Sequence, residues 1–231
     1  MGVERLETVE ELLEREWTVD GIPVLSARVS LPRLKAPERS RHLRRMDRYY
    51  RQFARSYLRY CGRFLFPQAQ AEFRQAAAAG APLPHFTAAM DYRVTWNEGG
   101  VWSLYVDARE RGGLPLTIRR GDTWDLHTGT PIPLSAFLPA RAPVRRLLTD
   151  LAAQEIRRQQ SAGVAAYRED WQRRLRRELC TGNYYLTAEG ICFFYQMYAL
   201  APAAEGTPVF CLPWGAHGTA APRTPEPEEA G

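Results

Sequence analysis

The chain has 231 residues, of which 45% are hydrophobic and 25% are charged. This length and composition allow a real core, as one domain or one domain with small appendages, and exclude a chain that is unfolded throughout. The net charge is +5, but Lys35 is the only lysine among 31 basic residues. So complete an arginine bias reflects a GC-rich genome at least as much as selection for guanidinium chemistry, and the charge alone is weak evidence for a nucleic-acid partner.

The first predicted element is an acidic amphipathic helix, because residues 3–16 place apolar side chains at helical spacing among glutamates. We expect residues 1–19 to be an appendage of the main domain. Residues 1–17 lack the basic and apolar regions of a secretory signal. No run reaches the ~18 apolar residues that a membrane-spanning helix needs. The default expectation is therefore a cytoplasmic protein with no membrane span.

A strand over residues 22–31 should come next, followed by a long helix over residues 39–64 that kinks at Pro67 and continues over residues 68–79. Its apolar side chains recur at spacings of three and four and predict one buried face. They are Met46, Tyr50, Phe53, Tyr57, Tyr60 and Phe64. Arginines recur in the same way on the opposite face. They are Arg41, Arg44, Arg48, Arg51, Arg55 and Arg59.

The arginine face has two interpretations. It contacts phosphates of a partner, or it is solvated and partly paired with acidic residues of the chain. No aromatic side chains for base stacking lie between the arginines, which favours the second interpretation. Nucleic acid is accordingly the least favoured partner.

The second half of the chain alternates strands and helices. We predict strands over residues 86–96 and 101–108, joined by an Asn/Gly hairpin turn, and a short strand over residues 123–126. Helices over residues 143–160 and 167–179 follow, and then apolar strands over residues 183–187, 191–198 and 207–212. The predicted fold class is α+β, with a mixed, largely antiparallel sheet covered by one long N-terminal helix and a C-terminal helix pair. We expect one domain over residues 20–214 and a disordered tail over residues 215–231, which is poor in apolar residues.

The four cysteines show no C-x-x-C pair and no cluster with histidine at metal spacing. Together with the cytoplasmic expectation, this predicts four free thiols. If the strands over residues 191–198 and 207–212 are neighbours, Cys192 and Cys211 approach each other, so a disulfide between them is the alternative.

Several motifs occur together in this chain. They are Gly21-Ile22-Pro23-Val24-Leu25, Tyr49-Tyr50, Trp102-Ser103-Leu104-Tyr105-Val106-Asp107, Thr123-Trp124-Asp125-Leu126-His127-Thr128-Gly129, Tyr184-Tyr185-Leu186-Thr187, Phe193-Phe194-Tyr195-Gln196 and Pro213-Trp214. In this order they resemble the bacterial domain-of-unknown-function family found in the anti-sigma factor RsiV and beside the deacetylase domain of PdaC. The resemblance covers roughly residues 20–214 and implies a binding or sensing domain, since the RsiV domain recognises lysozyme outside the membrane. This chain has Leu114-Pro115 where that family usually has Ala-His.

We find no G-x-S-x-G elbow, P-loop, H-E-x-x-H or G-x-G-x-x-G motif, so no cofactor and no metal site is predicted. The favoured function is non-catalytic binding of a protein or cell-wall-related ligand through loops of the sheet. The candidate binding residues are Gly112, Gly113, Leu114, Asp125, His127 and Thr128. The alternative is a hydrolase that acts through the Asp125/His127 turn, with His85 among its further candidates.

Overall fold

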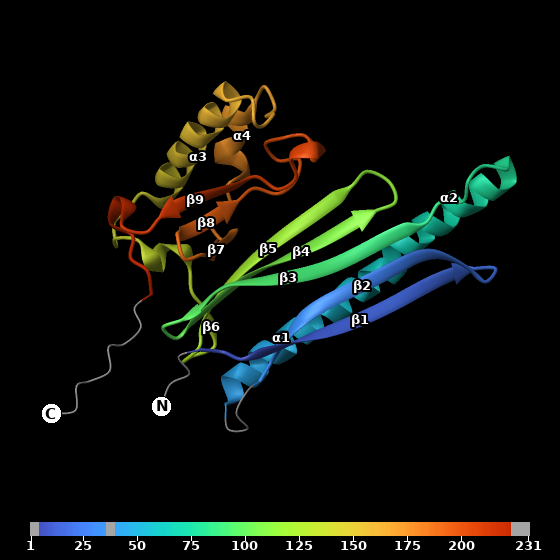
Figure 1. The fold of residues 1–231 in the computed structure, drawn as a ribbon, viewed down its shortest axis with the longest axis horizontal. Helices are drawn as coiled ribbons and strands as arrows, with labels where there is room; N and C mark the ends of the chain where they lie inside the picture. Colours follow the sequence, from blue (N-terminus) through green and yellow to red (C-terminus); the bar gives the residue numbers. More distant parts are fainter. Residues whose placement is uncertain (1–4, 36–39, 223–231) are drawn as a thin grey trace. The chain divides into compact units, whose positions relative to one another are not determined.

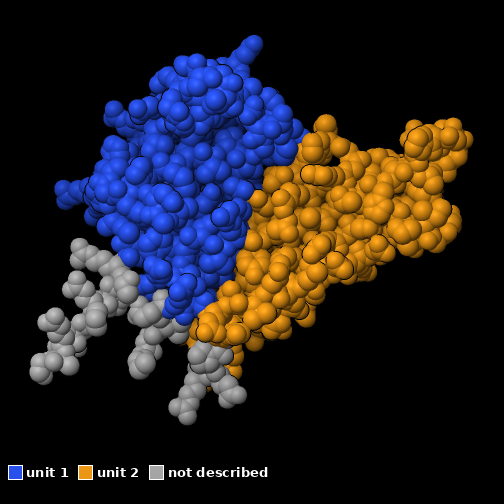
Figure 2. Space-filling view, in the orientation of Figure 1, with its two compact units in different colours: residues 1–6, 93–105, 119–231 blue, residues 7–92, 106–118 orange. Residues whose placement is uncertain are grey.

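A computed structural model describes residues 5–35 and 40–222 of the chain. The chain folds into two compact units, shown in Figure 2. Unit 1 comprises residues 1–6, 93–105 and 119–231, and unit 2 comprises residues 7–92 and 106–118. The single-domain boundaries proposed above stay a prediction. No helix in the described ranges is long and apolar enough to span a bilayer.

The strands form two sheets, and Figure 1 labels the strands of both in chain order. The six-stranded sheet has the order β1 (Thr8–Val19), β2 (Ile22–Leu34), β3 (Phe86–Glu98), β4 (Val101–Arg111), β5 (Leu116–Asp125) and β6 (Thr130–Pro131). The three-stranded sheet has the order β7 (Tyr184–Leu186), β8 (Gly190–Phe194) and β9 (Val209–Pro213). β2 and β3 are parallel, whereas β1/β2, β7/β8 and β8/β9 are antiparallel. The predicted α+β class with a mixed sheet is confirmed.

The helix predicted over residues 3–16 is wrong, because Thr8–Val19 is strand β1 and pairs with β2 along its length. Asp20 and Gly21 connect the strands with φ angles of 49° and 78°. Positive φ at both central residues is what a tight hairpin turn requires, and Asp-Gly is a strong signal for it. The glutamates of β1 face partners on β2, with Glu11 2.7 Å from Arg33 and Glu7, just before the strand, 3.3 Å from Lys35. A row of glutamates is therefore compatible with a strand when the next strand supplies cations.

The long helix is confirmed, with one irregularity in the middle. α1 (Arg41–Tyr60) is followed by a π-helical turn, η1 (Cys61–Leu65), and by α2 (Phe66–Ala79). The turn lies directly before Pro67, which has no N–H for the helical ladder, so the chain adjusts there instead of breaking. α1 packs on β2 within unit 2. Its Leu43, Met46 and Tyr50 are buried, whereas Phe64, predicted on the buried face, is 58% exposed.

The predicted C-terminal helix pair is also present, as α3 (Val144–Ser161) and α4 (Trp171–Glu178). In unit 1 these helices share one apolar cluster with the three-stranded sheet. Its members include Leu148, Ile156, Trp171, Phe193, Tyr195 and Phe210. All residues of β7 and β8 are buried, and the Tyr195 hydroxyl donates a hydrogen bond to the Leu175 carbonyl of α4. The aromatic run near the C-terminus is thus the centre of this core.

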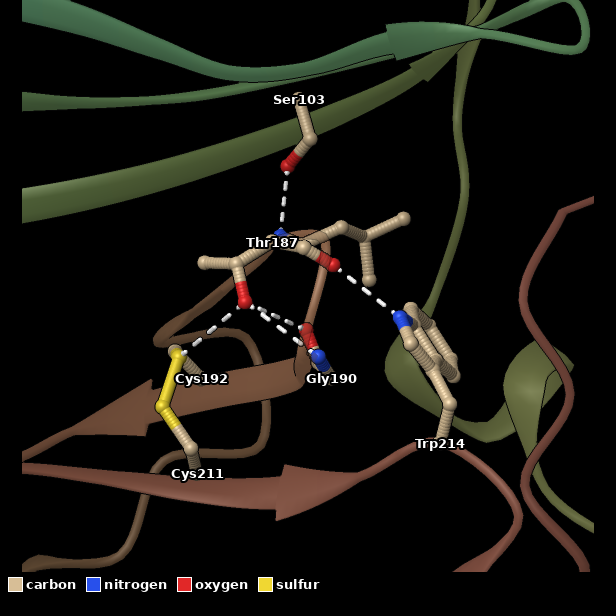
Figure 3. Close-up of a disulfide and its surroundings, with 7 residues drawn as sticks. Ser103, Thr187, Gly190, Cys192, Cys211 and Trp214 are labelled. Atoms are coloured by element: carbon tan, nitrogen blue, oxygen red, sulfur yellow. Dashed lines mark hydrogen bonds between the residues drawn. A yellow bond between two sulfur atoms is a disulfide. The ribbon is translucent and has the colours of Figure 1, made fainter.

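A disulfide joins Cys192 of β8 to Cys211 of β9, so the prediction of free thiols is wrong for these two residues (Figure 3). The two cysteines are direct partners in the β8/β9 register, which brings their side chains together. Cys61 and Cys180 are free. Beside the bridge, the Leu186 N–H donates to Ser103 Oγ at 2.9 Å, and Trp214 Nε1 donates to the Thr187 carbonyl at 3.0 Å (Figure 3). These bonds fix the β7–β8 turn.

The predicted disordered tail is wrong in its first residues. Ala216–Gly218 form a short 3-10 helix, and Thr219 is only 5% exposed. The Thr219 hydroxyl donates to the carbonyl oxygens of Pro213 and Ala216 at 2.8 Å each, so hydrogen bonding orders a segment that has little apolar surface. Residues 223–231 of the predicted tail lie outside the described residues.

Candidate functional site

The loop between β4 and β5 carries three of the predicted binding residues, Gly112, Gly113 and Leu114. A Cβ added at Gly112 would lie 2.2 Å from the ring of Phe86, so only glycine fits where the loop crosses that ring. The loop borders a recess of about 70 Å³ that is also lined by Leu65 and Gln68. Leu114 itself is 86% exposed. The recess is far below the volume of a typical small-molecule pocket, so the loop presents a surface rather than a cavity.

The side chains beneath this loop form a fixed support within unit 2. The Tyr57 hydroxyl lies 3.3 Å from the carbonyl oxygen of Ala89 on β3 and 3.2 Å from that of Arg109 on β4, and donates toward both. Tyr60 donates to the Glu110 carboxylate at 3.3 Å. Burial raises the pKa of Glu110, and the Tyr60 hydrogen bond only partly opposes it. Burial also raises the pKa of the Cys61 thiol to about 12, so this cysteine is an inert part of the support.

The remaining predicted residues lie at the end of β5, where Asp125 is the last residue, and in the turn that follows, which contains His127 and Thr128. Asp125 Oδ1 accepts the backbone N–H of His127 at 2.7 Å and that of Thr128 at 3.3 Å. Burial acts to raise the pKa of Asp125, but these hydrogen bonds outweigh it and the pKa is lowered. The imidazole of His127 lies against Gly100, where an added Cβ would be 2.3 Å from Nε2. The carboxylate is thus committed to closing the turn, which is what an Asp in this position does in many proteins.

The two predicted groups belong to different units. Gly112–Leu114 lie in unit 2, and Asp125, His127 and Thr128 lie in unit 1.

Sequence reasoning missed one polar pair, between Ser26 and His85. Ser26 Oγ lies 2.9 Å from His85 Nε2 beside an open groove of about 580 Å³ lined by Glu16, Ser26 and Thr87. In a serine hydrolase a carboxylate orients the histidine, whereas here Glu16 accepts a hydrogen bond from the serine at 3.4 Å. The pair therefore lacks the orienting contact of a triad. Its members are 59 positions apart in the sequence, and no local pattern connects them.

Arginines line two further recesses in unit 1, which sequence reasoning also missed. One, of about 530 Å³, is lined by Arg145, Arg146, Thr149, Asp150 and Arg176. Its neighbour, of about 480 Å³, shares Arg146 and Asp150 and adds His217 and apolar residues. Arg145 is held by the carbonyl oxygens of Arg176 at 3.1 Å and Leu179 at 3.4 Å. Arg146 pairs with Asp150 at 3.5 Å. Both recesses are shallow surface features with exposed arginines.

Comparison with known proteins places part of this chain beside one family. Residues 137–215 match the model described as "Protein of unknown function (DUF3298)". A solved structure of a DUF3298 family member from Bacteroides fragilis is similar over 92% of both chains, with 14% identity and a TM-score of 0.65. A DUF3298 family protein from Pseudomonas aeruginosa is similar over 95% of both chains, with 12% identity and a TM-score of 0.59. No curated protein matches the chain. At these identities the solved structures establish a shared fold.

Proposed function

We propose that this protein is a non-catalytic recognition domain that binds a protein or a cell-wall-related ligand, with the β4–β5 loop as its contact surface. The observation that carries the proposal is Leu114, which is 86% exposed at the tip of a loop whose backbone is held against Phe86. Exposed apolar side chains on a rigid loop are typical of binding surfaces. A loop held in one conformation also loses little entropy on binding.

The kind of ligand follows from the resemblance to the RsiV and PdaC domain, which accompanies protein recognition and cell-wall chemistry. Leu114-Pro115 replaces the Ala-His of that family, so the polar contact of the histidine is replaced by an apolar one. We therefore expect lysozyme to bind weakly or not at all. The disulfide between Cys192 and Cys211 supports a location in an oxidising compartment over the cytoplasmic expectation.

The hydrolase alternative has less support. Asp125 uses its carboxylate to accept backbone N–H groups of the turn, and Glu16 contacts Ser26 instead of His85. A general base has to be oriented toward the proton that it removes, and neither arrangement provides that. If the purified protein nevertheless turned over cell-wall fragments or generic esters, and lost that turnover on His127→Ala, the enzyme hypothesis would replace the present one.

The test uses two matched substitutions. Leu114→Asp places a charge at the tip of the β4–β5 loop, and Val164→Asp does the same on a loop of unit 1 at a side chain that is 66% exposed. Each variant is measured by sedimentation with purified peptidoglycan and by calorimetry with lysozyme and with proteins captured from the host. We expect Leu114→Asp to lose at least about tenfold in affinity for the ligand found. Equal affinities for the two variants would place the binding surface elsewhere.

A further inference from the structure

The exposed face of α1 is the strongest charged surface that the recognition site leaves unused. Residues 41–65 contain a single acidic residue, Asp47, among eight arginines. These are Arg41, Arg44, Arg45, Arg48, Arg51, Arg55, Arg59 and Arg63. Asp47 is already occupied, because it accepts from Arg33 at 2.9 Å and from the Leu34 N–H at 3.1 Å, and it forms an ion pair with Arg51 at 3.2 Å. It cannot neutralise the rest of the helix.

Four of these arginines, Arg41, Arg44, Arg48 and Arg55, are here called the arginine stripe. All four are exposed, and within residues 5–35 and 40–222 none of them forms an ion pair. Arginines elsewhere behave differently: Arg158 pairs with Glu155 at 2.6 Å and Arg173 with Asp170 at 2.7 Å. Like charges three and four residues apart destabilise an isolated helix, so the free protein carries an electrostatic cost that an anionic partner would remove.

The stripe is long and lies on a ridge. From Arg41 to Arg55 it extends about 21 Å at 1.5 Å per residue, and the opposite side of α1 is buried on β2. At the C-terminal end of α1 two aromatic side chains are exposed, Tyr60 at 36% and Phe64 at 58%. Their rings are 5.5 Å apart, and the guanidinium of Arg63 lies 5.7 Å from the Phe64 ring. Tyr60 is bonded to Glu110, so Phe64 is the exposed aromatic side chain that follows the row of cations along the chain.

We propose that the arginine stripe docks this protein on an anionic lipid bilayer, with Phe64 entering the headgroup region. A ridge suits a flat partner, and arginines with neighbouring aromatics match the two components of an interfacial surface, charge and apolar contact. Binding of single-stranded nucleic acid uses aromatics interleaved with cations in a groove. Here the aromatics stand at one end only and the cations stand on a ridge, so lipid is favoured over nucleic acid.

The experiment is co-sedimentation of the whole protein with vesicles at physiological salt. One set contains phosphatidylglycerol mixed with phosphatidylcholine, and the other contains phosphatidylcholine alone. The test variant is Arg44→Gln/Arg48→Gln/Arg55→Gln. The matched control, Arg146→Gln/Arg173→Gln/Arg177→Gln, removes the same charge at arginines that pair with acidic neighbours. All six side chains are exposed, so both variants should fold, which circular dichroism checks.

We expect binding to the phosphatidylglycerol vesicles only, and a loss of about 100-fold in the test variant, at about fivefold per arginine. The control variant should lose less than about threefold, and Phe64→Ser should weaken binding further by several-fold. Equal losses in the two triple variants would reduce the effect to net charge and overturn the proposal. So would an absence of vesicle binding, or tighter binding to duplex DNA or polyglutamate than to vesicles. None of these outcomes concerns ligand binding by the β4–β5 loop. The lipid proposal and the proposed function can therefore fail independently of each other.

Discussion

The three-stranded sheet of unit 1 and the β1–β2 hairpin of unit 2 are both antiparallel, but different forces hold them together. Every residue of β8 is buried, its aromatic side chains pack in clusters, and a disulfide closes it onto β9. In β1 only Val19 is buried and the other residues are half-buried or exposed, and glutamates on and beside it pair with cations on and beside β2. Burial of one aromatic side chain contributes several kcal/mol, whereas an exposed ion pair contributes about 0.2–1 kcal/mol. The hairpin therefore depends on the buried face of β2 against α1 more than on the charges that its surface displays.

The largest expected difference between the two regions concerns apolar side chains. Phe194→Ala in β8, where the side chain is 1% exposed, should lower the free energy of unfolding by about 3–5 kcal/mol. Leu12→Ala in β1, at 43% exposure, should lower it by about 0.5 kcal/mol or less. Urea denaturation of both variants makes the comparison. Similar losses would mean that the two regions share one source of stability.

The disulfide should have the next largest effect. Its cysteines are 19 residues apart, and closing a loop of that length stabilises a protein by about 3 kcal/mol through the unfolded chain. The Cys192→Ala/Cys211→Ala variant should lose about that much under oxidising conditions. Wild type measured with reductant is the matched control and should approach the variant. The disulfide would be contradicted if reductant did not change the free energy of unfolding of the wild type and if four thiols were labelled before reduction.

Asp47 differs from the exposed ion pairs of the hairpin, since its side chain is only 10% exposed and forms ion pairs with two arginines. Asp47→Asn keeps the shape but removes the charge, and should cost about 2 kcal/mol, within the range for hydrogen bonds to charged groups. Thermal denaturation measures the loss. Glu14→Gln is the control, because its partner Arg28 is 3.9 Å away and the two side chains are 65% and 68% exposed. That change should cost about 0.5 kcal/mol or less, and a larger cost would show that the surface pairs of the hairpin matter.

The smallest expected effect is a pH dependence in unit 1. Hydrogen bonds from Arg174 and Arg173 lower the pKa of Asp170 to about 2, from an ordinary value of 3.8. Because the folded pKa lies below the unfolded one, the stabilisation is complete above about pH 4 and is lost as the pH falls toward 2. Asp170→Asn should remove this stabilisation at neutral pH, flatten that part of the stability curve, and leave the stability near pH 2 nearly unchanged. If stability fell with pH between about 4 and 2 as steeply in Asp170→Asn as in the wild type, other carboxylates would be responsible for the acid sensitivity.

The same contrast explains which parts of the fold could be predicted from the sequence. Two patterns each fit only one type of secondary structure. The apolar runs of β4 and β8 fit strands, and the heptad-like spacing of α1 fits a helix, so these elements can be predicted correctly from the sequence. The charged residues of β1 fit a helix as well as a strand, and the hairpin turn at Asp20-Gly21 decides between them. The regular helical spacing predicts a buried Phe64, but Phe64 lies within the π-helical turn Cys61–Leu65, which changes that spacing and has no sequence signature.

The candidate site was predictable in part. The glycines at 112 and 113 mark a permissive turn, and the structure assigns Gly112 a contact that requires glycine. Asp125 was identified through its turn chemistry, which is the role that it has. The Ser26–His85 pair and the arginine recesses of unit 1 depend on contacts between distant segments. No local pattern encodes such contacts. Whether Gly112–Leu114 bind a ligand stays a prediction.

The disulfide has a mechanical consequence as well as an energetic one. If the molecule were stretched from its two ends, the segment between Cys192 and Cys211, with a sequence separation of 19, would remain a closed ring after the rest had unravelled. The extended chain would then be shorter by about 65 Å, at ~3.4 Å per residue, than the same chain after reduction. A protein exposed to tension would thus keep the β8–β9 segment as a covalent loop, and its extended length would report the redox state of its surroundings.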